Sequence, residues 1–84
     1  MVTTQRMADL KAFVQFWKDA KAGAENQLNR LKDAHKLGIS ITDQHGRDIL
    51  PYRIAEEIVA VNAFADGLTR AESLLAQAQA GHDV

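Results

Sequence analysis

The sequence predicts an all-α fold, a long antiparallel helical hairpin with helices at about 4–37 and 51–80. Two observations support it. Apolar residues recur at intervals of three and four through both segments, and helix-breaking residues gather between them and at their ends. The 84 residues are expected to form a single domain, 1–84, with a frayed tail at 81–84. Because one such hairpin has a thin core, we expect two to pair into a four-helix bundle.

The first helix is predicted by a heptad rhythm that runs through most of the first 37 residues. Thr3 or Thr4 can cap its start, and Gly38 can take the left-handed conformation that ends a helix. The positions of the stripe are Met7, Leu10, Val14, Trp17, Lys21, Ala24, Leu28, Leu31 and His35.

The second helix is predicted to begin at Pro51, because proline favours the first helical turn. Glu56 and Glu57 follow early, as the helix dipole prefers, and Gly81 ends the segment. Its apolar stripe consists of Ile54, Ile58, Val61, Ala65, Leu68, Leu75 and Ala78.

The register that best aligns the two stripes places Gly23 level with Gly67, where the lack of side chains allows the backbones to approach closely. The same register brings lysines of the first helix near acids of the second, in the pairs Lys18 with Glu72 and Lys32 with Glu57.

The connection at 39–50 is expected to form a short β-hairpin-like or ordered turn, because Asp43 suits the start of a tight turn and Gly46 its left-handed close. It is longer than the roughly 2–8 residues that join antiparallel helices. The favoured interpretation is that its apolar residues, Ile39, Ile41, Ile49 and Leu50, cap the open end of the core. The alternative is a recognition finger that binds a partner through Asp43, Gln44, His45 and Arg47.

Apolar residues cover more of the first helix near its start than one partner helix can bury, which predicts a homodimer or larger homo-oligomer. A different partner chain and a monomer with curled-back termini are the alternatives. Phe16 is the sharpest indication, since it lies off the main stripe, whereas Trp17 also fits the core of a single hairpin. The expected self-association interface is Met7, Leu10, Phe13, Phe16, Trp17, Phe64, Leu68, Leu74 and Leu75.

The charges are unevenly distributed, with a basic first half and an acidic second half, although the net charge is −1. A basic stripe on the first helix is a possible nucleic-acid surface, but Glu25 interrupts it and the pI near 6.3 is low for nucleic-acid binding. Pairing with the acids of the second helix is the favoured explanation. The stripe consists of Lys11, Lys18, Lys21, Lys32 and Lys36.

Residues that could support catalysis are sparse. The chain has no cysteine, and His35, His45 and His82 lack the spacing of helical metal ligands. We therefore expect no enzymatic activity, no cofactor and no metal. No apolar run approaches the roughly 20 residues of a membrane span, and no signal peptide is evident, so a cytoplasmic location without membrane contact is expected.

Together these features predict a small homo-oligomeric adaptor or inhibitor that binds a larger protein, a role to which phage-type helical proteins offer a fold-level analogy only. Two alternatives stay open. One is a nucleic-acid-associated regulator that uses the lysine stripe. The other is a self-assembling structural or virion component.

Overall fold

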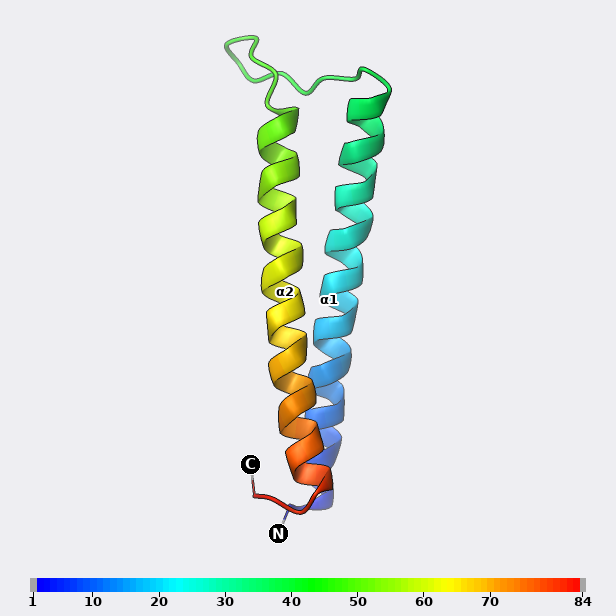
Figure 1. The fold of residues 1–84 in the computed structure, drawn as a ribbon, viewed down its shortest axis with the longest axis vertical. Helices are drawn as coiled ribbons and strands as arrows, with labels where there is room; N and C mark the ends of the chain where they lie inside the picture. Colours follow the sequence, from blue (N-terminus) through cyan, green and yellow to red (C-terminus); the bar gives the residue numbers. More distant parts are fainter. Residues whose placement is uncertain (1, 84) are drawn as a thin grey trace.

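The computed structural model describes residues 2–83, so Met1 and Val84, the last residue of the expected tail, lie outside the described part. Two helices, α1 (Thr4–Lys36) and α2 (Leu50–Gln79), run antiparallel and side by side (Figure 1). The hairpin measures 59 × 19 × 16 Å, with both termini at one end and the connecting loop, the tip, at the other. The predicted all-α helical hairpin is confirmed. The first helix ends one residue before the predicted position 37, and the second begins and ends one residue before the predicted positions 51 and 80.

Local hydrogen bonds define both ends of α1. The Thr3 hydroxyl oxygen accepts a bond from the Arg6 N–H at 3.0 Å, which satisfies one of the free donors of the first turn. At the other end Gly38 has a φ of 74°, and the Ile39 N–H donates to the Ala34 carbonyl at 2.9 Å. This is the hydrogen-bond pattern of a helix closed by a left-handed glycine, so the chain turns sharply away from α1 at this point.

The start of α2 is held by a carboxylate one residue before the helix cap. Asp48 Oδ1 accepts from the Leu50 N–H at 3.0 Å, and Pro51 occupies the first turn. At the far end the His82 N–H donates to the Gln77 carbonyl at 2.9 Å. The first two residues of the expected frayed tail, Gly81 and His82, therefore continue the hydrogen bonding of the helix terminus.

The core is a single narrow seam between the helices. On α2 the buried positions along the seam are mostly small, whereas α1 contributes larger aliphatic side chains. A two-helix arrangement covers only one side of each helix, so many other stripe residues stay partly exposed. The buried residues are Leu10, Val14, Ala24 and Leu31 of α1, and Leu50, Gly67, Ala71 and Ala78 of α2.

The register of the helices is set by Trp17 and differs from the predicted one. A Cβ added to Gly67 would lie 2.7 Å from carbon atoms of the Trp17 ring, whereas one added to Gly23 meets nothing within 4 Å. The expected close approach of Gly23 and Gly67 was therefore wrong. A ring of this size needs a facing position without a side chain, and this steric demand outweighs agreement between the stripes.

The ion pairs expected from the predicted register are also absent. In residues 2–83, Lys18 and Glu72 form no ion pair, and neither do Lys32 and Glu57. Exposed pairs of this kind contribute only about 0–1 kcal/mol, so they are too weak to oppose the packing of the seam.

The two helical glycines provide a matched test of this packing. Gly23→Ala should raise the free energy of unfolding by about 0.5–1 kcal/mol, because alanine favours the helix and the added methyl meets open space. Gly67→Ala should lower it by about 1–3 kcal/mol, because the methyl collides with Trp17. Urea unfolding followed by circular dichroism measures both, and equal stabilisation by the two variants would contradict the Trp17–Gly67 contact.

Candidate functional site

The tip is an ordered turn built on backbone hydrogen bonds. Thr42 and Asp48 form an isolated antiparallel bridge, and the described residues contain no longer strand. The Asp43 N–H donates to the Arg47 carbonyl at 2.9 Å, and the Gly46 N–H donates to the Asp43 carbonyl at 3.0 Å. Gly46 has a φ of 78°, which closes the turn as its position predicted.

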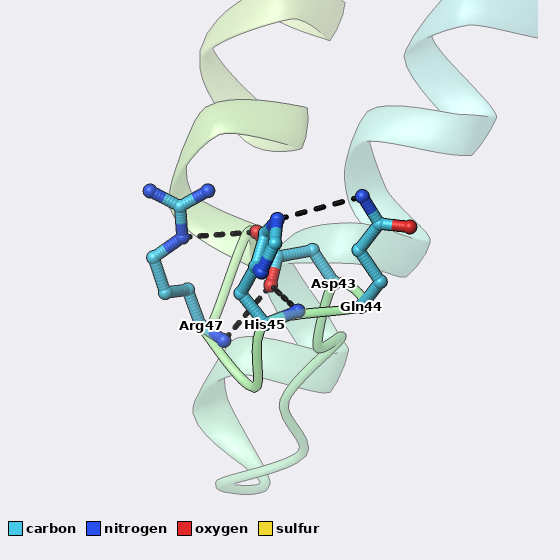
Figure 2. A network of polar contacts seen from close by, with 4 residues as sticks. All are labelled: Asp43, Gln44, His45 and Arg47. Carbon is cyan, nitrogen blue, oxygen red and sulfur yellow. Dashed lines mark hydrogen bonds and ion pairs between the residues drawn. The ribbon is translucent and has the colours of Figure 1, made fainter.

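The Asp43 carboxylate organises the turn from within (Figure 2). Its Oδ1 accepts from the backbone N–H groups of His45 at 2.8 Å and Arg47 at 3.0 Å, and its Oδ2 accepts from Arg47 Nε at 3.1 Å. The backbone hydrogen bond from Arg47, helped by those from His45 and the Arg47 side chain, lowers the pKa of Asp43 below its ordinary value against a weaker opposing effect of desolvation.

The four residues predicted to form a partner-binding tip therefore have two roles. Gln44, His45 and Arg47 are exposed, and the Gln44 Nε2 and His45 Nε2 atoms lie 3.4 Å apart. The Asp43 side chain is only 21% exposed, because it faces its own hydrogen-bond donors. Asp43 thus positions the turn, while the other three side chains are available for contact.

Apolar side chains around the tip are more exposed than expected. Leu50 is fully buried and Ile49 half-buried, so these two cap the open end of the seam. Ile39 and Ile41 do not cap it and are exposed, because the chain leaves the seam at Gly38 and the loop projects past α2 (Figure 1).

Two further exposed apolar residues near the tip were missed by sequence reasoning, Leu37 and Tyr52. Both residues lie outside the apolar stripes, at the tip end of the hairpin, and this position could have revealed from the sequence that they are exposed.

An aromatic cluster surrounds Trp17 in the half of the hairpin nearer the termini. Its ring makes edge contacts with Phe13 and Phe16, at centroid distances of 5.9 and 5.3 Å, and a tilted contact with Phe64 at 6.1 Å. Phe13 is 44% exposed and Phe16 is 60% exposed. The Trp17 Nε1 atom is buried without a hydrogen-bond partner in the described residues, so this side chain acts through packing.

Phe13 and Leu74 together line two adjoining hollows between the helices. One hollow is completed by Trp17, Gly67 and Arg70, and the other by Arg6, Asp9 and Leu10. We call the surface formed by Phe13, Phe16, Gly67, Arg70 and Leu74 the aromatic face. It combines exposed aromatic rings with an arginine side chain, and both residue types are enriched in protein interfaces.

The residues predicted to mediate self-association occupy different environments. Leu10 is already buried in the seam, whereas Phe13 and Phe16 are exposed. Met7 lies in a separate hollow with Val2 and Lys11. The other predicted residues, Trp17, Phe64, Leu68, Leu74 and Leu75, are half-buried.

The lysine stripe lies away from the aromatic face. At 100° per residue, Lys11 lies about 160° from Phe13 around α1, and Lys18 lies about 160° from Phe16. Lys21 Nζ pairs with Glu25 Oε1 at 3.3 Å. The remaining members, Lys11, Lys18, Lys32 and Lys36, are exposed. The hairpin thus keeps its basic and its aromatic surfaces on different sides.

Within residues 2–83, no three or more His, Asp or Glu side chains gather in a way that could hold a metal ion, and neither helix is long and apolar enough to cross a membrane. Comparisons with protein-family models, curated proteins and solved structures give no match to this chain. The candidate sites therefore rest on the geometry of the tip and of the aromatic face.

Acidification provides a test of the tip. Since the pKa of Asp43 is lowered in the folded chain, its stabilising effect is complete above the ordinary pKa of 3.8 and is lost as the pH falls through the lower folded value. The turn should therefore keep its order near pH 4 and loosen at lower pH. Nuclear magnetic resonance of the His45 and Arg47 amide groups across this range measures the change.

Removal of the Asp43 carboxylate by substitution should loosen the turn at neutral pH, as its protonation should in acid. Asp43→Ala removes the acceptor of both amide groups, so these amides should exchange with solvent faster while α1 and α2 stay protected. Asp33→Ala, which removes an exposed carboxylate of α1, is the control. Unchanged exchange at His45 and Arg47 in Asp43→Ala would refute the role of Asp43.

Proposed function

We propose that this chain is a non-catalytic helical adaptor or inhibitor, which pairs with a second copy through the aromatic face into a four-helix bundle and presents its tip to a larger protein. The observation that carries the proposal is the exposure of Phe13 and Phe16 beside Trp17. Exposed rings of this size in so small a chain favour a covering partner, since burial of apolar area stabilises by about 25 cal/mol per Å².

The thinness of the seam supports self-association. Small domains without disulfides or metals commonly gain stability from oligomerisation, and this chain has no cysteine. Two hairpins stacked on their aromatic faces would convert two single seams into one four-helix core. Trp17 would then lie inside that core and not at its edge.

The organisation of the tip supports the second half of the proposal. Its turn is held by Asp43, so little conformational entropy is lost when Gln44, His45 and Arg47 contact a partner. The exposed Tyr52 adds apolar area nearby. Because the tip and the termini lie at opposite ends of a 59 Å molecule, the tip stays accessible when the aromatic face is covered.

Phe16→Asp tests self-association, because this side chain lies outside the seam and is 60% exposed. The wild-type chain should sediment as a dimer, and the variant should raise the dissociation constant about 30-fold or more, as loss of a central aromatic contact does. Leu37→Asp, at a residue 76% exposed at the tip end of the hairpin and far from the aromatic face, is the matched control and should leave the dimer intact. Equal masses for the wild-type chain and Phe16→Asp, with native helicity, would contradict the proposal.

Capture of partners from host lysate tests the tip. A tagged wild-type chain should retain one dominant protein after nuclease treatment, and a variant with residues 43–47 replaced by glycine and serine should lose it. Retention of that protein by the replaced tip would show that the tip is structural only.

The same experiment separates the other two functions. Loss of all partners on nuclease treatment, and in a Lys11→Gln, Lys18→Gln variant, would indicate a nucleic-acid-associated regulator, since those lysines are exposed. Recovery of the chain's own copies alone would indicate a self-assembling structural component.

A further inference from the structure

We propose that the two copies pack antiparallel about a two-fold axis that passes beside Phe16, with α1 on α1 and α2 on α2 of the second copy. The inference rests on the proposed self-association and specifies its geometry. Three observations support it: the order of large and small residues on the aromatic face, the position of Phe16 along the hairpin relative to Gly67 and Arg70, and the charges of α2.

Each helix carries a row of positions at heptad spacing on the side of the aromatic face. On α1 the row runs from Phe13 through Phe16 to Ala20, and on α2 it runs from Leu74 through Arg70 and Gly67 to Ala63. In both rows the large residue lies toward the termini and the small residue toward the tip. A copy turned end for end therefore places large residues over small ones on both helices at once.

The two rows share one centre. Trp17 packs on Gly67, and Phe13 lines the same hollows as Leu74, so Phe16 lies level with the part of α2 between Gly67 and Arg70. Phe16 is the middle of the α1 row, and that part of α2 is the middle of the α2 row. One two-fold axis can serve both helices only if their centres coincide in this way.

The contacts that follow are complementary in size. Phe13 would face Ala20 of the second copy, Leu74 would face Ala63 of the second copy, and Phe16 would meet its own equivalent at the axis. Phe16 is the more exposed of the two phenylalanines on this face, at 60%, which agrees with a central position in the contact. Interiors packed to native density need such alternation of large and small residues.

The charges of α2 fit the same axis. Asp66 and Arg70 are both exposed and form no ion pair with each other among the described residues. Rotation about the axis brings Arg70 beside Asp66 of the second copy, and the reverse pair forms by symmetry. Opposite charges on either side of a two-fold axis form complementary pairs across a self-complementary surface, and Asp66 and Arg70 flank the proposed centre of the α2 row.

The parallel arrangement, with both tips at one end, fits the same surface poorly. It would place α1 on α2 of the second copy, so that Phe13 meets Leu74 and Ala20 meets Ala63. Large residues would then crowd at one end and small residues would leave space at the other, and both effects destabilise a packed interface.

The antiparallel arrangement has a consequence for binding. The two tips would project from opposite ends of the dimer, so one dimer could hold two partner molecules well apart. Linked sites of this kind strengthen binding to a partner that itself carries two targets.

Cysteine pairs test the arrangement directly, because the native chain has no cysteine. When Phe13→Cys and Ala20→Cys chains are mixed and oxidised, the mixed disulfide between them should be the main product. A mixture of Phe13→Cys and Leu74→Cys chains should give little mixed disulfide. The reverse ranking would overturn the antiparallel axis while leaving self-association intact. A wild-type chain that stays monomeric at all concentrations would instead defeat the proposed function itself.

Charge reversal is a second test that leaves the aromatic residues in place. Arg70→Asp should raise the dimer dissociation constant about tenfold, because it sets two acids side by side. The double variant Asp66→Arg, Arg70→Asp should restore most of the affinity, because the pair forms again with its signs exchanged. Failure of the double variant to restore affinity, with helicity unchanged, would overturn the predicted pairing.

Discussion

The contact between the Trp17 ring and Gly67 is the constraint on which the rest of this structure depends. The ring fits between two helices only where the facing position has no side chain, so this pair sets how far α1 slides along α2. The small residues that follow on α2, Ala71 and Ala78, keep the seam narrow. Phe13 and Phe16 pack against the edge of the ring and stay at the surface, where they form the aromatic face.

The tip depends on a different kind of interaction. Asp43 gathers the amides of His45 and Arg47 and the Arg47 side chain, so a polar network holds the loop where apolar packing is scarce. Charge-assisted hydrogen bonds of this kind are directional, and they order a short turn without a core beneath it. The chain thus uses apolar packing at the termini end and hydrogen bonding at the tip, and the proposed adaptor function assigns one task to each end.

A thin seam also explains why a second copy is the natural complement of this hairpin. Each helix of the hairpin is covered only along the seam. Of the uncovered surfaces, one carries the exposed aromatic residues near the termini, and the opposite one carries the lysines. Stacking on the aromatic side buries the rings and leaves the lysines and both tips in water. The uneven charge of the two halves of the chain, which suggested attraction between α1 and α2, is then mainly a property of the solvent-facing surface.

The sequence by itself determined the helical hairpin, because periodicity, Pro51, Gly38 and Gly46 act through local backbone preferences. It also identified Phe16 as a surface residue from its place off the stripe. Only the tertiary structure decided the register, because aligning the two stripes takes no account of the volume of the Trp17 ring, and exposed charge pairs are too weak to fix the offset. The register follows from the large Trp17 ring, which packs on Gly67 because glycine has no side chain there. The two residues are fifty positions apart in the sequence, so no local pattern predicts their contact.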